Sequence, residues 1–247
     1  MILPQTSPLR FVAGLQLLTV AVGLMAAAMA LRLLAAIGWR GVLTTFSCYG
    51  LVAAFVVFDL DRHAPHQRFG AANSVTLARA ALTALLWGVV GETMLGARDL
   101  DQGLRWLLAI AATGALVLDG VDGWVARRRG MTSRFGADFD LEVDCLFMLA
   151  LALLVYGTGQ VGIWVLSNGL MRYFFVLAGW LQPTLAAPLE PLRRRKVICV
   201  VQGAVLIATL APILPNEVAP PLCLAGLALL AYSFGVDVLS LAKAKGR

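Results

Sequence analysis

Four aspartates whose spacing could support chemistry lie between residues 119 and 144. Asp119 and Asp122 are three residues apart, and Asp140 and Asp144 are four apart. On a helix, either spacing puts both carboxylates of a pair on one face. Carboxylates gathered in a medium of low dielectric constant repel one another and need a positive partner. Their oxygens are hard ligands that suit Mg²⁺, Mn²⁺ or Ca²⁺, so the pattern predicts a divalent-metal site.

A second acidic pair leaves the choice of ligands open. Asp138 and Glu142 are also four residues apart, but they lie out of phase with Asp140 and Asp144 and face roughly the other way. The spacing alone does not say which pair turns inward. The alternative for all these charges is that they are solvated residues of a loop or of the membrane interface. Acids within membrane segments are costly and usually functional, which favours a site.

The composition indicates what must position these residues. The chain has 247 residues, of which 60% are hydrophobic and 14% charged, and its mean hydropathy is +0.83. A soluble domain would carry roughly 25% charged residues. The four cysteines stand singly in apolar runs and are interpreted as small apolar residues. We therefore expect an integral membrane protein.

Apolar segments of about the length that crosses a bilayer predict an all-α, polytopic transmembrane bundle of about eight spans. The first is interpreted as a retained helix and not as a cleaved signal peptide. The stretches 64–69, 182–196 and 215–221, rich in proline or charge, are interpreted as loops. The predicted spans are 11–31, 42–59, 74–95, 105–126, 139–157, 161–182, 197–214 and 221–241.

The distribution of basic residues predicts the orientation. With both termini on one side, that side holds most of the 20 Lys and Arg residues. Positive residues favour the cytoplasmic side, so we expect both termini there. The net charge of +6 is then explained by topology and by attraction to anionic lipid headgroups. The sequence has no basic module with interleaved aromatic residues, which would indicate nucleic-acid binding.

The acidic stretch resembles the motif of the CDP-alcohol phosphatidyltransferase family, D-x2-D-G-x2-A-R-x8-G-x3-D-x3-D. Upstream, Asn73, Thr76 and Arg79 resemble the N-x-x-T-x-x-R of the family's first core helix. The resemblance implies a six-helix catalytic core over residues 73–247, with two N-terminal helices (1–72) outside it. The matching positions of the long motif are Asp119, Asp122, Gly123, Ala126, Arg127, Gly136, Asp140 and Asp144.

Family membership would make the protein an enzyme of phospholipid synthesis. Such enzymes transfer a phosphatidyl or similar group from a CDP-linked donor, here CDP-diacylglycerol, to an acceptor hydroxyl and release CMP. The resemblance implies that Asp119, Asp122 and Asp140 hold Mg²⁺ or Mn²⁺. It implies that Asp144 completes the site and acts as the general base.

The resemblance also implies a set of donor-binding residues. Arg127 suits the diphosphate, and Gly123 and Gly136 would let the nucleotide approach the backbone. Asn73 and Thr76 have an alternative interpretation, as a helix N-cap and a first-turn hydroxyl. The full set is Asn73, Thr76, Arg79, Gly123, Ala126, Arg127, Ser133 and Gly136.

Two basic residues are candidates for binding a phosphorylated acceptor. Arg172 lies within a predicted span, with Asp237 as a candidate partner, and Lys196 ends a basic run that opens the next span. Membrane anchoring is the alternative for that run. Phosphatidylglycerophosphate synthases usually continue D-P-x-A-D-K, whereas this chain has Asp140-Leu-Glu-Val-Asp144-Cys, so the acceptor stays open.

Two other functions compete with this interpretation. One is an enzyme of the same family that uses CDP-choline or CDP-ethanolamine. The other is a cation-binding transporter, which would more often carry its acids near the membrane centre and show repeated halves. We expect an integral protein of a bacterial inner membrane, with its site on the cytoplasmic side, and homodimers are common among the enzymes that it resembles.

Overall fold

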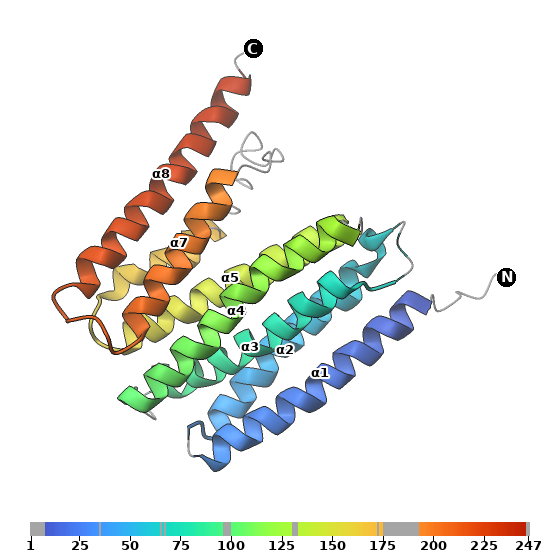
Figure 1. Cartoon of the computed structure of the whole chain (residues 1–247), viewed down its shortest axis with the longest axis horizontal. Helices are drawn as coiled ribbons and strands as arrows, with labels where there is room; N and C mark the ends of the chain where they lie inside the picture. Colours follow the sequence, from blue (N-terminus) through green and yellow to red (C-terminus); the bar gives the residue numbers. More distant parts are fainter. Residues whose placement is uncertain are drawn as a thin grey trace. The chain divides into compact units, whose positions relative to one another are not determined.

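The part of the chain that the computed structural model describes consists mainly of helices (Figure 1). The structure describes residues 8–34, 36–64, 66, 68–95, 100–129, 133–171, 173–174 and 193–245; for 122–127, 129, 193, 237 and 239–245 it describes only the backbone. These ranges contain no strand. The helices are α1 (Pro8–Leu33), α2 (Trp39–Asp59), η1 (Leu60–His63), α3 (Ala71–Met94), α4 (Gln102–Arg129), α5 (Arg134–Gly157), η2 (Ile163–Leu166), α7 (Arg193–Leu210) and α8 (Ala219–Lys245).

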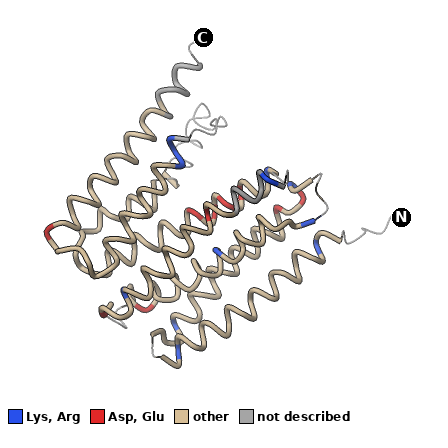
Figure 2. The backbone as a smooth tube through the Cα atoms, in the orientation of Figure 1, with Lys and Arg blue, Asp and Glu red and all other residues tan. Residues whose placement is uncertain are grey.

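The protein is an all-α, polytopic membrane protein, as predicted. Five described segments are long and apolar enough to cross a bilayer. Figure 2 shows that charged positions gather near helix ends and on the part of α4 and α5 that is treated below. Much of the predicted sixth span, 161–182, lies outside the described residues. The five segments are Pro8–Leu33, Trp39–His63, Ala71–Met94, Gln102–Val121 and Ala219–Val236.

Several predicted boundaries were wrong by a few residues. Helix α5 begins at Arg134 and not at 139, because the hydroxyl of Ser133 accepts a hydrogen bond from the backbone N–H of Gly136 (3.0 Å) and caps the helix. Part of each of two predicted loops is helical, since α7 begins at Arg193 and α8 at Ala219. Prolines are tolerated in the first turn of α8, where backbone N–H groups have no partner within the helix.

The chain divides into two compact parts. The first comprises Met1–Asp99 and Ile110–Phe147, and the second comprises Leu100–Ala109 and Met148–Arg247. The acidic stretch belongs to the first part. In the second part, the guanidinium of Arg105 donates to the backbone oxygens of Leu210 (2.8 Å) and Thr209 (3.2 Å). It thereby satisfies carbonyl groups at the end of α7 and joins that end to the start of α4.

Within the first part, α2 and α3 approach each other closely through small residues. A Cβ on Gly41 would lie 2.8 Å from the backbone oxygen of Gly88. A Cβ on Gly88 would overlap Oγ1 of Thr45, and one on Gly91 would overlap Oγ1 of Thr44. Small residues of this kind let two membrane helices pack backbone against backbone. The N-terminal helices are therefore packed directly on α3.

A buried carboxylate reinforces this contact. Glu92 on α3 is 5% exposed and accepts hydrogen bonds from the backbone N–H groups of Gly38 (2.8 Å) and Gly41 (2.6 Å). These groups belong to the start of α2, where no earlier turn supplies acceptors. The positive end of the helix dipole also favours a carboxylate at this position. Glu92 thus caps a helix other than its own.

We expect Gly88→Ala to destabilise the protein by ~1–3 kcal/mol, because the new methyl group would overpack the contact with Thr45. The matched control is Gly114→Ala on α4, where a Cβ meets nothing within 4 Å. That variant should be neutral or more stable by up to about 1 kcal/mol. Thermal unfolding in detergent measures both. Equal melting temperatures for the two variants would contradict the packing described for α2 and α3.

Candidate active site

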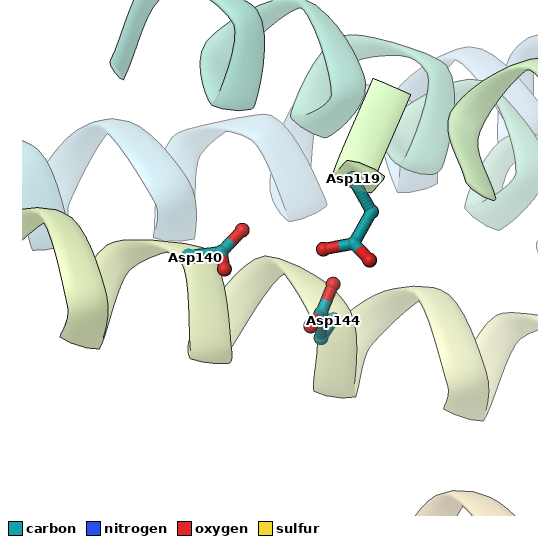
Figure 3. A group of neighbouring side chains, drawn as sticks. All are labelled: Asp119, Asp140 and Asp144. Carbon is teal, nitrogen blue, oxygen red and sulfur yellow. The ribbon is translucent and has the colours of Figure 1, made fainter. Parts of the chain in front are cut away.

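Three aspartates from two helices meet in the first part of the chain. Asp119 is on α4, and Asp140 and Asp144 are on successive turns of α5 with their carboxylates turned toward it (Figure 3). One carboxylate oxygen from each residue lies within 4.8 Å of the others. Asp138 points elsewhere, with Oδ2 3.8 Å from Nη1 of Arg62 and a half-exposed side chain. The open question of phase is thus resolved in favour of Asp140 and Asp144.

A buried arginine on α3 joins the three carboxylates. The side chain of Arg79 is 1% exposed. Its Nη1 donates to Oδ1 of Asp119 at 2.8 Å, and its Nη2 forms an ion pair with Oδ1 of Asp144 at 3.1 Å. Nη2 also donates to the carboxylate of Asp140 and to its backbone oxygen (3.3 Å). Arg79 therefore supplies positive charge to the cluster from within the chain.

The described cluster has the charge and the chemistry to hold a divalent cation. Three carboxylates and one guanidinium leave a formal charge of −2 on these four side chains. Mg²⁺ takes oxygen ligands at about 2.0–2.1 Å, so opposite ligands lie about 4 Å apart. The oxygens of Asp119, Asp140 and Asp144 already lie within a comparable distance. The exclusively oxygen donor set suits Mg²⁺, Mn²⁺ or Ca²⁺ better than zinc.

Next to this cluster, three of the predicted donor-binding residues lie together. A Cβ on Gly136 would lie 3.1 Å from Oδ1 of Asn73 and 3.2 Å from Oγ of Ser133. The interpretation of Asn73 as an N-cap was wrong, since α3 begins at Ala71 and Asn73 lies within its first turn. Its Nδ2 donates to the backbone oxygen of Phe69 at 2.6 Å. This end of α3 and the start of α5 therefore form one polar corner.

Comparison with protein-family models decides the family. The model described as CDP-alcohol phosphatidyltransferase matches residues 69–236. The chain belongs to the CDP-alcohol phosphatidyltransferase family. No curated protein and no solved structure matched it. Family membership confirms the resemblance inferred from the motif and supports the transfer of a phosphatidyl group from a CDP-alcohol to an alcohol acceptor.

The family match begins close to the predicted start of the core. It includes Phe69 and all of α3, and leaves out α1, α2 and η1. The division into residues 1–72 and 73–247 stays a prediction. For a CDP-alcohol phosphatidyltransferase, whose family is generally dependent on divalent metal, the cluster of Asp119, Asp140 and Asp144 is the natural candidate for the active centre.

Other predicted site residues of this family member are described only in part. The backbone of α4 carries Asp122, Gly123, Ala126 and Arg127, but their side chains lie outside the described residues. Arg172 lies outside them altogether. Thr76 is buried, and its Oγ1 donates to the backbone oxygen of Ala72 at 3.1 Å. Its interpretation as a first-turn hydroxyl was wrong, because α3 begins at Ala71 and Thr76 lies in the second turn.

Lys196 belongs to the second part of the chain. It lies on α7, and its side chain is exposed. Its basic neighbours Arg194 and Arg195 are half-buried, and Nη2 of Arg194 donates to the backbone oxygen of Ser233 at 3.3 Å. The basic run thus includes at least one contact that joins α7 to α8. The acceptor role of Lys196 stays a prediction.

One residue that contacts the site region was not predicted from the sequence. His63, in η1, is 1% exposed, and its Nδ1 lies 2.7 Å from Oγ of Ser133. The only sequence signal was its rarity, since the chain contains two histidines and both follow the second apolar run. The pairing of Arg79 with the aspartates was also not anticipated, because the family resemblance assigned Arg79 to the donor.

Proposed function

We propose that this protein transfers the phosphatidyl group of CDP-diacylglycerol to an acceptor hydroxyl and releases CMP, with Mg²⁺ or Mn²⁺ as its cofactor. The observation that carries the proposal is the meeting of Asp119, Asp140 and Asp144 on a chain of this family. Their oxygens would hold the metal, together with Asp122. A divalent cation at such a site neutralises the diphosphate and stabilises the leaving nucleotide.

Asp144 is the candidate general base. Its side chain is 38% exposed, compared with 32% for Asp140 and 11% for Asp119. The side chain of Asp144 is therefore open enough for an acceptor hydroxyl to reach it, whereas that of Asp119 is mostly covered. The carboxylate would take the hydroxyl proton as the oxygen attacks the phosphorus. Arg127 is the candidate for binding the diphosphate oxygens through its fork of N–H groups.

The donor nucleotide would bind at the polar corner of α3 and α5. Asn73, Ser133 and Gly136 lie together there, and a Cβ on Gly136 would make a tight contact with the side chains of both neighbours. The polar side chains of Asn73 and Ser133 suit a nucleoside, whereas the acyl chains of the donor would lie in the membrane. Thr76, Arg79, Gly123 and Ala126 complete the donor set that the family motif implies.

For the acceptor we propose a phosphorylated alcohol held by Arg172 and Lys196. An acceptor phosphate entering a site rich in carboxylates needs cations at its own end. An arginine within an apolar segment also needs a partner or a polar cavity, which favours a functional role for Arg172. We further propose that both termini and the site face the cytoplasm of a bacterium, because most basic residues then lie on that side.

The test is a transfer assay with purified protein. The protein in detergent or nanodiscs is given CDP-diacylglycerol and one acceptor at a time: glycerol 3-phosphate, inositol phosphate, serine, inositol or choline. We expect CMP release with a phosphorylated acceptor, loss of release in EDTA, and recovery on addition of Mg²⁺ or Mn²⁺. The physical reason is that the diphosphate charge must be neutralised before CMP can leave.

Several results would contradict the proposal. Full activity in thoroughly chelated protein would exclude a requirement for a divalent metal. Release of CMP only from CDP-choline or CDP-ethanolamine, with diacylglycerol as the acceptor, would show that CDP-diacylglycerol is not the donor. Activity with uncharged alcohols alone would exclude a phosphorylated acceptor. Ion flux through reconstituted vesicles in the absence of any CMP release would favour the transporter that the sequence left open.

A further inference from the structure

The end of the second N-terminal helix meets the start of α5. In η1, Nε2 of His63 lies 2.9 Å from the backbone oxygen of Arg68, and Nδ1 lies 2.7 Å from Oγ of Ser133. A carbonyl oxygen only accepts hydrogen bonds, so the proton of the neutral ring is on Nε2 and Nδ1 is an acceptor. The hydroxyl of Ser133 therefore donates to His63.

Ser133 is at the same time the N-cap of α5. Its Oγ accepts the backbone N–H of Gly136 at 3.0 Å, and its backbone oxygen accepts that of Ala137 at 3.1 Å. The hydroxyl thus donates in one direction and accepts in the other. Because the O–H group of Ser133 points to His63, His63 determines the orientation in which Ser133 caps the helix. His63 lies outside the family match, which begins at residue 69.

Aromatic packing holds the same junction. The ring of His63 contacts that of Phe135 edge-on, with centroids 5.6 Å apart. Phe55 on α2 stacks on Phe135 and on Phe139, with centroids 6.2 and 6.1 Å apart. Phe135 and Phe139 are almost completely buried. The first two turns of α5 are therefore enclosed by residues of α2 and η1, and Phe139 directly precedes Asp140.

We propose that His63 is a positioning residue for the metal site. By orienting Ser133 it fixes the start of α5, and α5 carries Asp140 and Asp144 toward Asp119 and Arg79. This inference rests on the proposed function only in assuming that these aspartates bind a divalent metal. It gives α2 and η1 a role in the catalytic centre, beyond that of an additional membrane anchor.

The test measures metal binding without turnover. Purified variants are titrated with Mg²⁺ in detergent, and the rise in melting temperature gives an apparent affinity. His63→Phe keeps a planar ring beside Phe135 and removes both ring nitrogens. We expect about a tenfold weaker apparent affinity, as is typical when the groups behind metal ligands are lost. Ser133→Ala should have a similar effect. The double variant should be no worse than the stronger single variant, because either single change already removes the hydrogen bond between the two side chains.

Two matched variants separate positioning from general stability. His66→Phe makes the same change in the neighbouring ring, whose centroid is 5.3 Å from that of His63, and should leave the Mg²⁺ affinity unchanged. His63→Asn keeps an acceptor near the position of Nδ1 and should recover most of the affinity. If His63→Phe does not fold, Ser133→Ala and His63→Asn carry the test.

Unchanged Mg²⁺ affinity in His63→Phe or in Ser133→Ala would overturn the inference, as would a loss in His66→Phe equal to that in His63→Phe. The proposed function fails separately. A wild-type protein that responds to Mg²⁺ but transfers nothing from CDP-diacylglycerol would contradict the function and leave the role of His63 standing. A wild-type protein with no response to divalent metal would contradict both.

Discussion

Asp144→Asn should lower the rate of CMP release by at least ~10²-fold, the usual contribution of a general base. The amide cannot take the proton of the acceptor hydroxyl. It is also a poorer metal ligand than a carboxylate, which adds to the loss. Steady-state assays under saturating Mg²⁺ measure the rate. Binding of the CDP-linked donor, measured by titration calorimetry, should survive better than turnover, because the other aspartates stay in place.

The matched control for this variant is Asp138→Asn. It makes the same change on the same helix, at a half-exposed carboxylate that faces Arg62 and not the cluster. Its rate should stay within about twofold of the wild type, because a surface ion pair contributes little. Near-wild-type turnover in Asp144→Asn, or equal losses in both variants, would rule out Asp144 as the base.

Arg79→Met should destabilise the metal-free protein by about 3 kcal/mol. Removing one partner of a buried ion pair typically costs about 3–5 kcal/mol, since the other charge stays buried without compensation. The lower end applies because the side chains of Asp140 and Asp144 are about one-third exposed. Unfolding in mixed micelles containing EDTA measures the loss. Mg²⁺ should restore more stability to Arg79→Met than to the wild type.

Arg79→Lys is the conservative companion. It keeps one positive charge but loses the fork that reaches three carboxylates at once, so its stability in EDTA should fall between those of the wild type and Arg79→Met. If Arg79→Met were as stable as the wild type in EDTA, Arg79 would not be the counter-charge of the cluster. If Mg²⁺ stabilised Arg79→Met and the wild type equally, Arg79 and the metal would not neutralise the same carboxylates.

The helices were largely predictable because their signal is local. A run of apolar residues long enough for a bilayer needs no knowledge of its neighbours, and α1 to α4 begin and end within a few residues of their predicted spans. The start of α5 was placed five residues late, at 139, because the polar residues of its first turn interrupt the apolar run. The cap at Ser133 was not used as a signal.

The site was predictable only as far as its residues lie near one another in sequence. The motif brought Asp119, Asp140 and Asp144 together, and the structure confirms that they meet. Contacts between distant segments carried no such signal. Arg79 lies 40 residues before Asp119, and His63 lies 70 residues before Ser133. Their pairing depends on how α3 and η1 pack against α4 and α5, which local patterns do not specify.

The pairing of Arg79 with the aspartates also bears on how the chain is made. Inserting a charged side chain into a bilayer without a partner of opposite charge has a high free-energy cost. The partner of a newly inserted helix can be another helix of the same chain. Because Arg79 on α3 meets Asp119 on α4 and Asp140 on α5, the charges of three successive helices cancel in part as the helices associate. Assembly of these three helices therefore does not depend on a metal ion, and the divalent cation that we propose for this site would bind after the helices have associated.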